Sequence, residues 1–262
     1  MCGEATEKIK IFIKEFFKMG YDLGLVSVTF RDKTPREILN AMKDAGLKVI
    51  EWGSDVHCPP ESAGEIAKLQ REFGVKCCSY GTYFRLGVTP IKELGGYIAA
   101  AKTLGTDILR LWCGDKNSED YSTEEKESLF EQCKAAAKLA EEHKVTLCME
   151  CHNYTYTNTV QGAKELIKAV NSENFQMYWQ PNQFKSFEEN LEYAREVSPY
   201  TKHIHVFKWR GQKKLSLYEG IAEWKQFLGC FEGECALLLE FMPDDKLETL
   251  KTEAEALREI VK

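Results

Sequence analysis

Eight short runs of β-forming residues recur along the chain, and longer helical patterns separate them. The runs span residues 22–26, 48–52, 75–80, 108–112, 146–150, 176–179, 203–207 and 236–241. Successive runs begin 26 to 38 residues apart, which leaves room for one helix and two loops between neighbouring strands. Strands that alternate with helices in this way pair in parallel. The alternation therefore predicts an α/β fold.

Short motifs mark where the predicted helices begin and end. Thr34, Ser122 and Ser186 each stand three residues before a glutamate, which predicts a capping box at a helix start. Gly46 and Gly105 follow helical patterns and predict their ends. No linker interrupts the series, and no glycine-rich dinucleotide or phosphate loop follows a strand. Residues 21–262 are therefore predicted to form one (β/α)8 barrel, a TIM barrel, rather than an open sheet.

The first 20 residues read as an additional N-terminal helix. Apolar residues such as Ile9, Phe12 and Phe16 alternate there with lysines and glutamates, so we expect an amphipathic helix that closes the bottom of the barrel. The segment lacks the uninterrupted apolar stretch and cleavage site of a secretory signal. No run approaches the roughly 18 apolar residues of a membrane span. We therefore expect a cytoplasmic protein that does not bind membranes.

The charge balance bears on the partners that the chain could have. The sequence has 262 residues and a formal net charge of −6. Proteins bind nucleic acid largely by releasing counterions from phosphates through lysine and arginine, so an acidic chain of this kind is not expected to bind DNA or RNA. A small molecule is the expected partner.

Ten cysteines raise the question of a disulfide framework or a zinc site. Cys77 and Cys78 are adjacent, and Cys148 and Cys151 lie three residues apart in an apolar run. Side chains alternate between the two faces of a strand, so the members of each pair are expected on opposite sides. There they could not bind one zinc ion together. We expect buried, reduced thiols, which are typical of a reducing compartment.

Polar side chains stand near the carboxyl ends of four consecutive predicted strands, where barrels of this type carry their active sites. Glu150 ends the fifth strand, Gln180 follows the sixth, His205 lies in the seventh and Glu240 follows three leucines of the eighth. A carboxylate on so apolar a strand is costly to bury unless a cation or a hydrogen-bond donor satisfies it. The four groups could converge on one divalent metal ion, for which Mn, Mg, Co and Zn are the candidates.

Glu150 and Glu240 are the candidate catalytic pair. A bound ion would polarise a sugar carbonyl and hydroxyl, while the two carboxylates move a proton at the adjacent carbon. The alternative for these glutamates is a buried ion pair with Arg110 or Lys208. The alternative for His205 is a core histidine whose ring nitrogens are both hydrogen-bonded.

Other side chains near the strand ends are candidates for contact with a substrate. The candidate substrate-binding residues are His57, Arg110, Trp112, His152, Asn182 and Lys208. Arg110 could instead orient a carboxylate or form a charge pair inside the barrel. Several aromatic residues could wall a sugar site or fill an ordinary core; they are Trp52, Tyr80, Tyr83, Trp112, Trp179 and Trp209. His203 is expected to lie deeper than His205 and to be structural.

Five segments together resemble the xylose-isomerase-like barrel superfamily, which includes sugar epimerases and isomerases, inosose dehydratases and type-IV apurinic endonucleases. The segments cover residues 50–57, 109–112, 149–153, 205–207 and 239–241. The resemblance extends over nearly the whole chain. It specifies the superfamily well and the reaction poorly.

The resemblance implies roles for particular residues. It assigns one metal ion to Glu150, the Gln180 position, His205 and Glu240, and it makes the two glutamates an acid and a base on opposite faces of a substrate carbon. It also places His57 in contact with the substrate. The family has an aspartate where this chain has Gln180. The amide oxygen is a weaker ligand than a carboxylate, so the metal could be bound loosely, with an extra water, or not at all.

Several functions stay open on the sequence alone. The first is a metal-dependent isomerase or epimerase of a sugar, a sugar phosphate or a cyclitol. The second is a lyase of the inosose-dehydratase type, in which the same intermediate expels a hydroxyl group. The third is a metal-free sugar-binding barrel without activity, which Gln180 suggests. The five histidines are too few for the trinuclear zinc site of an apurinic endonuclease. The resemblance is also compatible with a homo-oligomer.

Overall fold

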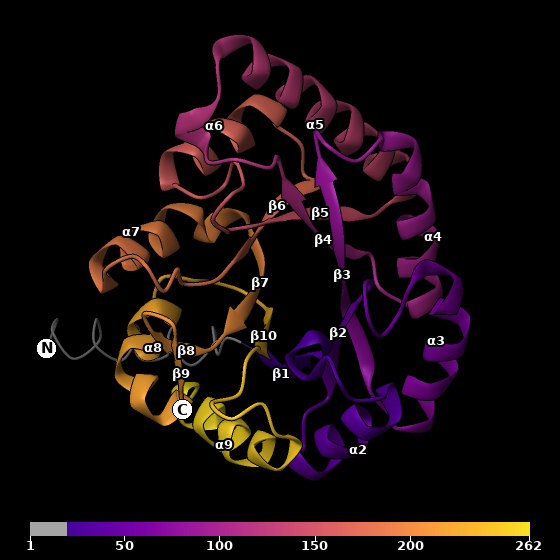
Figure 1. Ribbon diagram of the computed structural model, residues 1–262, viewed down its shortest axis with the longest axis vertical. Helices are drawn as coiled ribbons and strands as arrows, with labels where there is room; N and C mark the ends of the chain where they lie inside the picture. The colour runs from indigo at the N-terminus through magenta and orange to yellow at the C-terminus, as the bar shows by residue number, and fades with distance from the viewer. Residues whose placement is uncertain (1–19) are drawn as a thin grey trace, which may run out of the picture.

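The structure is a computed structural model that describes residues 20–262, and its central feature is a closed barrel of parallel strands (Figure 1). The order around the barrel is β1-β10-β7-β6-β5-β4-β3-β2. The barrel strands are β1 (Tyr21–Val26), β2 (Val49–Gly53), β3 (Lys76–Leu86), β4 (Ile108–Cys113), β5 (Thr146–Glu150), β6 (Phe175–Trp179), β7 (Thr201–Val206) and β10 (Cys235–Leu239). The predicted (β/α)8 barrel is confirmed.

The strand boundaries differ from the prediction most clearly at β3. This strand continues to Leu86, whereas the sequence pattern ends at Tyr80. Its pairing with β4 shifts register between Gly81 and Arg85, so the strand carries extra residues past the regular ladder. Such a register shift breaks the alternation on which the sequence prediction depends.

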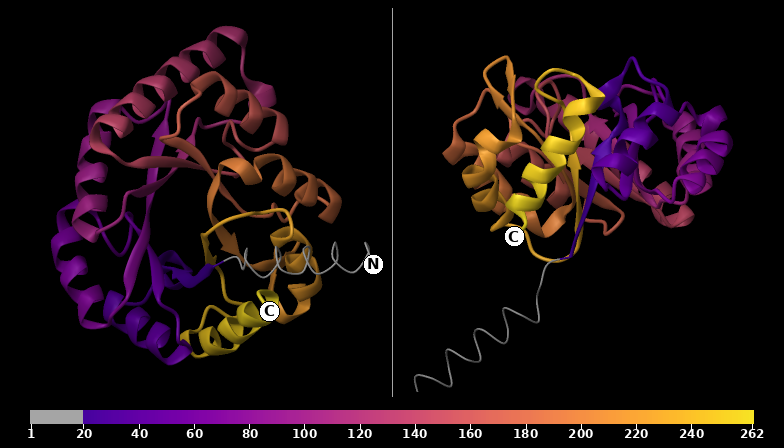
Figure 2. Two further views of the ribbon diagram at one scale, coloured as in Figure 1. Left: turned by 180° about the vertical axis from the view of Figure 1, so that it is seen from behind. Right: turned by 90° about the horizontal axis from the view of Figure 1, so that it is seen from below.

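The helices lie outside the strands and form a ring (Figures 1 and 2). They are α2 (Pro35–Ala45), α3 (Ala63–Glu72), α4 (Leu94–Leu104), α5 (Thr123–His143), α6 (Val160–Val170), α7 (Phe187–Val197), α8 (Ile221–Leu228) and α9 (Leu250–Ile260). The three predicted capping boxes are present at α2, α5 and α7. Helix α9 contacts both α2 and α8 and so closes the ring.

The predicted N-terminal helix falls on residues 1–20, of which 1–19 lie outside the described residues. Within residues 20–262, no helix is both long and apolar enough to cross a membrane.

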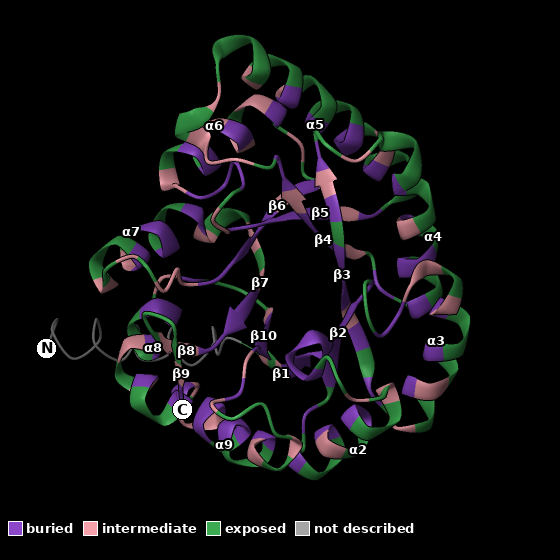
Figure 3. Ribbon diagram, viewed as in Figure 1, coloured by how far each residue is buried: buried purple, intermediate pink, exposed green. Residues whose placement is uncertain are grey.

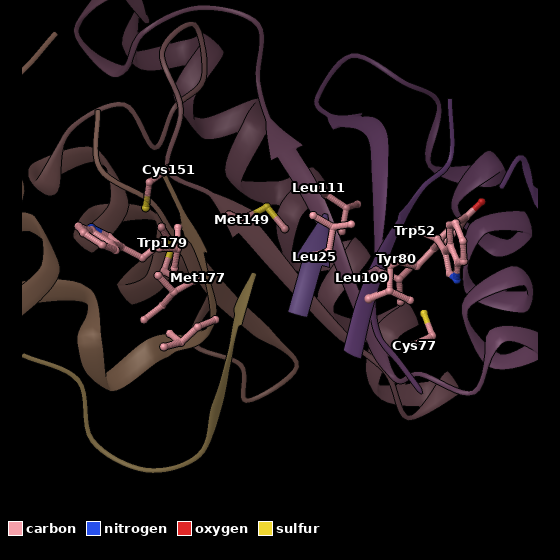
Figure 4. Packing of buried hydrophobic residues seen from close by; sticks show 14 of the residues in the cluster. Leu25, Trp52, Cys77, Tyr80, Leu109, Leu111, Met149, Cys151, Met177 and Trp179 are labelled. Atoms are coloured by element: carbon pink, nitrogen blue, oxygen red, sulfur yellow. The ribbon is translucent and has the colours of Figure 1, made fainter. Parts of the chain in front are cut away.

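The apolar core lies between the barrel and the helices. Barrel side chains that point outward, such as Leu109, Leu111 and Met149, pack there (Figure 4). Trp52 and Trp179 belong to the same cluster. The strands are largely buried, while the exposed residues lie on the outer sides of the helices (Figure 3). This layer holds the ring of helices against the barrel.

Paired cysteines show how the alternation sorts side chains. Cys148 packs in a small cluster inside the barrel with Val26, Tyr178 and Leu238, whereas Cys151 packs in the outer cluster. Cys77 and Cys78 divide in the same way. The expectation that each pair faces opposite sides is confirmed.

Polar groups occupy much of the barrel interior. Between the inward apolar side chains stand Glu51, Ser79, Arg110, Tyr178 and His205, which are all buried. Barrel interiors are usually filled with layers of branched aliphatic side chains. These polar groups meet near the carboxyl ends of the strands, which is where a functional site is expected in such a barrel.

Candidate active site

The four residues predicted to share a metal ion come together at the carboxyl ends of their strands. Nδ1 of His205 lies 3.2 Å from Oε1 of Gln180, 3.4 Å from Oε2 of Glu240 and 3.6 Å from Oε1 of Glu150. His205 is on β7 and pairs in register with Leu238 of β10, two residues before Glu240. All four side chains are buried. The barrel thus points three oxygen atoms at one imidazole nitrogen.

Glu150 is held by two donors. Nη1 of Arg110 donates to its Oε2 at 2.7 Å, and Nε1 of Trp112 donates to the same oxygen. Burial by itself would raise the pKa of Glu150, but Arg110 and His205 outweigh this effect and hold the pKa well below its usual range. Its other oxygen, Oε1, faces His205. Glu150 is therefore a fixed carboxylate with one oxygen committed and one available.

Glu240 is in a different setting. Its side chain is also buried, and among the described residues its ion-pair contact is with His205 alone. Burial raises the pKa of Glu240 to about 7, against the opposing attraction of His205. The two glutamates thus face one histidine but differ in how firmly their charge is held.

Glu51 joins this network and is absent from the residues predicted from the sequence. It lies on β2, is completely buried, and accepts hydrogen bonds from Oγ of Ser79 at 2.6 Å and Nε of Arg110 at 2.9 Å. Burial would raise its pKa, but Arg110 and His205 hold the pKa far below its usual range. Arg110 therefore bridges Glu51 and Glu150. The prediction that Arg110 forms a charge pair inside the barrel or orients a carboxylate agrees with this arrangement.

A glycine makes room for the bridge. A Cβ atom at Gly81 would lie 2.4 Å from Oε1 of Glu51 and 2.8 Å from Nη2 of Arg110, so a larger residue would displace these two groups. A signal for Glu51 did exist in the sequence. It is a carboxylate between Ile50 and Trp52 in an apolar strand, which is the same kind of signal that identified Glu240.

His205 stands between carboxylates on both sides. Its Nε2 lies 3.4 Å from Oε1 of Glu51 without forming a hydrogen bond of good geometry, and its ring is 4.7 Å from that of Tyr178. Burial would lower its pKa, but Glu240, Glu51 and Glu150 outweigh burial and raise the pKa to about 10. His203 is different, because its two ring nitrogens contact the backbone of Cys78 and Ala236, as expected for a structural histidine.

A cavity of about 300 Å³ opens above this network. Glu150, Gln180 and Glu240 line it together with aromatic side chains. The ring of His152 stacks on Trp112 at 5.1 Å between centroids and an interplanar angle of 22°. The wall aromatics include Tyr83, Trp112, Phe207, Trp209 and Phe241. The cavity thus combines carboxylates at its base with flat apolar walls.

The aromatic residues predicted near the strand ends divide between two environments. Tyr83, Trp112 and Trp209 line the cavity. Trp52, Tyr80 and Trp179 point the other way, into the core beneath the helices (Figure 4). Their position in the strand decides this, because neighbouring residues of a strand face opposite sides.

The remaining predicted residues lie at different distances from the cavity. Asn182 lines it, and its side-chain amide donates to Oδ1 of Asn153 at 2.6 Å. His57 does not line it, since its ring nitrogens lie 3.1 Å from Oγ of Ser27 and from the carbonyl oxygen of Lys33. Lys208 is paired with Glu223 and lines a neighbouring cavity. The structure therefore does not bring His57 and Lys208 to the carboxylates.

Comparison with known proteins shows to which family this chain belongs. The model of the family described as xylose isomerase-like TIM barrel matches residues 29–260. The chain belongs to this family. No match was found among curated proteins.

Solved structures share the fold of this xylose isomerase-like barrel at low sequence identity. The probable 3-DHS dehydratase AsbF of Bacillus anthracis is 17% identical, with a TM-score of 0.75 and coverage of 92% of this chain and 99% of that chain. The IOLI protein, described with a binding zinc atom, is 17% identical, with a TM-score of 0.72 and coverage of 92% and 98%. The 3-keto-D-glucoside 4-epimerase YcjR of E. coli is 12% identical, with a TM-score of 0.70 and coverage of 91% and 99%.

The donor atoms of this xylose isomerase-like barrel suit a divalent ion. Two carboxylates, an amide oxygen and an imidazole nitrogen are ligands that Mg, Mn, Co and Zn accept. Nε2 of Gln180 donates to the carbonyl oxygen of Cys151 at 3.3 Å, so its oxygen is turned toward His205. Within residues 20–262, no three His, Cys, Asp or Glu side chains are already spaced to hold an ion. The groups fit a metal by the chemistry of their donor atoms.

Proposed function

We propose that the chain is an enzyme that isomerises or epimerises a sugar or sugar derivative by moving a proton at a carbon next to a carbonyl. The observation that carries this proposal is that two buried carboxylates, Glu150 and Glu240, line one cavity and both face Nδ1 of His205. Membership of the xylose isomerase-like family supports it. So do the descriptions of structural neighbours, which include an L-ribulose 3-epimerase and a D-allulose 3-epimerase.

The two glutamates take different parts in the proposed reaction. Glu150 is fixed through Oε2 by Arg110 and Trp112, so its free oxygen acts as the base that removes the proton. Glu240 has no such pair of donors among the described residues, so it acts as the acid on the other side of the carbon. In the reverse direction the two roles exchange.

A divalent ion, when bound by Glu150, Gln180, His205 and Glu240, would polarise the carbonyl and so acidify the neighbouring C–H bond. The aromatic walls would bind the apolar face of the sugar ring and exclude water from the carboxylates. Trp112 and His152 form one such wall as a stacked pair. Arg110 acts by holding Glu150 in place.

The principal test is solvent exchange. Ketoses and keto sugars are incubated with the protein in D2O, with and without added Mn²⁺, Mg²⁺, Co²⁺ or Zn²⁺, and deuterium uptake next to the carbonyl is followed by NMR. We expect metal-stimulated exchange in the wild type and its loss in Glu150→Gln and Glu240→Gln. Glu141→Gln is the matched control, because Glu141 is exposed on α5. Exchange that persists in both site variants would rule out the acid–base pair.

A second candidate is a lyase that uses the same proton abstraction and then expels a hydroxyl group as water. The description of a structural neighbour as a probable dehydratase favours it. The mass of the product distinguishes the two reactions, since the lyase product is lighter by one water. If metal analysis and thermal shifts show no response to any divalent ion and no sugar exchanges, the chain is instead a sugar-binding barrel without activity.

A further inference from the structure

A second cavity, of about 170 Å³, adjoins the cavity above the glutamates. The two share lining residues from the segments that follow β6 and β7, namely Pro181, Asn182, Gln183, Phe207 and Trp209. Ligand cavities in proteins run from roughly 300 to 1,000 Å³. The cavity at the glutamates is by itself at the lower end of this range. A ligand that extended into the second cavity would therefore have more suitable space.

A hairpin contributes Lys208 and Trp209 to the wall of the second cavity. Strands β8 (Lys208–Arg210) and β9 (Lys213–Leu215) pair antiparallel directly after β7, and Figure 1 shows them next to α8. Lys208 forms an ion pair with Glu223 of α8 at the cavity surface. A Cβ atom at Gly220 would lie 3.1 Å from Cδ of Lys208, so the glycine leaves room for the lysine stem. The hairpin and α8 thus place a cation and a carboxylate at the side of the cavity.

Trp209 stands in the wall of both cavities and has an unused donor. Its Nε1 is buried and has no hydrogen-bond partner among the described residues. By contrast, Nε1 of the neighbouring Trp224 donates to the carbonyl oxygen of Phe207 at 2.9 Å. An unpaired buried donor is unfavourable, but Nε1 of Trp209 is enclosed by protein atoms. The part of Trp209 that the cavities share is therefore its indole ring, a flat apolar surface of the kind on which sugar rings pack.

We propose that the second cavity is a subsite for a glycosyl substituent, so that the substrate is a keto sugar carrying a second sugar rather than a free monosaccharide. Lys208 and Glu223 offer a donor and an acceptor to its hydroxyl groups, Asn182 and Gln183 offer amides, and Trp209 offers a flat face. The proposal rests on the proposed function in one respect, because it places the carbonyl-bearing ring against Glu150 and Glu240. It also gives Lys208 the contact with substrate that the sequence predicted, but at a different part of the substrate.

The test compares D-fructose with two ketose disaccharides, maltulose and isomaltulose, which carry glucose on O4 and O6. Exchange in D2O is followed with the full-length protein, and kcat/KM is measured for each sugar. We expect at least one disaccharide to exceed D-fructose about tenfold or more. Lys208→Met should reduce this ratio fivefold or more, mainly through KM for the disaccharide. Lys225→Met is the matched control, since Lys225 is exposed on α8 and lines neither cavity, and it should leave the ratio unchanged.

The outcomes separate this proposal from the proposed function. If D-fructose exchanges as fast as both disaccharides, the subsite is overturned and the proposed function stands. The same conclusion follows if the ratio of kcat/KM for the disaccharide to kcat/KM for D-fructose is equal in Lys208→Met and Lys225→Met. If no sugar exchanges, the proposed function fails, and calorimetric titration with the same three sugars decides the subsite. Tighter binding of a disaccharide that Lys208→Met weakens would support it, and equal or absent binding would overturn it. Thermal unfolding of Lys208→Met checks that the variant is folded.

Discussion

The outer layer of the barrel and its interior are built from the same strands, but the outer layer is apolar whereas the interior carries charged groups beside a small apolar cluster. On β2, Ile50 and Trp52 point outward into the apolar core, and Glu51 between them points inward to Arg110. On β4, Leu109 and Leu111 point outward, and Arg110 between them joins two carboxylates. On these two strands, one face supplies apolar burial that stabilises the fold. The other places charged groups where only specific partners make them tolerable.

This difference distinguishes burial that stabilises the fold from burial that serves a function. An outward residue stabilises the protein because its burial removes apolar surface from water. An inward carboxylate such as Glu240 has a raised pKa, about 7, because burial opposes its charge. It costs stability where it stands, so its presence calls for a functional explanation.

The largest expected effect comes from an inward residue. Glu240→Gln should lower kcat for the solvent-exchange reaction by about 10²- to 10⁴-fold, which is the usual contribution of a general acid or base. Its free energy of unfolding should stay equal or rise, because the variant no longer buries a carboxyl with few donors. Exchange kinetics and urea unfolding measure the two effects. A large loss of stability together with unchanged kcat would contradict the view that inward residues serve function and outward residues stabilise the fold.

An outward residue should behave in the opposite way. Leu111 is completely buried in the outer cluster, so Leu111→Ala should lower the free energy of unfolding by about 2–5 kcal/mol. Because Leu111 faces away from the cavity, kcat of the folded variant should change far less than in Glu240→Gln. Urea unfolding at 25 °C gives the first quantity. A kcat loss as large as that of Glu240→Gln would contradict the assignment of the faces.

Glu51 tests the comparison further, because its side chain points into the barrel but positions Arg110 instead of contacting a substrate. Glu51→Gln should lower the free energy of unfolding by about 1–3 kcal/mol, because Arg110 loses one of its two charged partners. We also expect kcat to fall more than KM changes, since Glu150 would be held less well. Ser79→Ala, which removes only the neutral donor to Glu51, serves as comparison. An unchanged kcat with reduced stability would make Glu51 purely structural.

The smallest expected effect concerns His57 and the pH dependence of stability. Burial lowers the pKa of His57, so below the ordinary pKa of about 6.5 the unfolded chain takes up a proton more readily than the folded one. Its contribution is thus fully present above about pH 6.5 and is lost as the pH falls through the lowered folded pKa. Thermal unfolding between pH 5 and 8 should show a shallower pH dependence in His57→Gln than in the wild type. An identical profile would show that this histidine does not titrate differently on folding.

Most of the fold could be predicted from the sequence because its signals are local. The capping boxes at Thr34, Ser122 and Ser186 involve residues three positions apart, and the barrel strands other than β3 repeat their alternation within five or six residues. The end of β3 could not be predicted, because its register shift depends on pairing with β4.

Part of the candidate site could be predicted from the sequence. Glu150, Gln180, His205 and Glu240 could be chosen because a barrel brings the ends of its strands together. Glu51 could not be linked to them, since nothing in the sequence says that Arg110 reaches from Glu51 to Glu150. His57 and Lys208 were expected at the same site, but their own partners, Ser27 and Glu223, turn them elsewhere.

The sequence by itself determined the eight strand–helix units, the faces of each strand and the presence of carboxylates on two buried strand ends. These follow from periodicity, which depends on neighbours in the chain. Only the tertiary structure decided that Glu150 and Glu240 differ, that Arg110 joins Glu51 to Glu150, and that Lys208 faces a second cavity beside the first. Hydrogen bonds, burial and pKa depend on groups that are distant in sequence, and closure of the barrel brings these groups together.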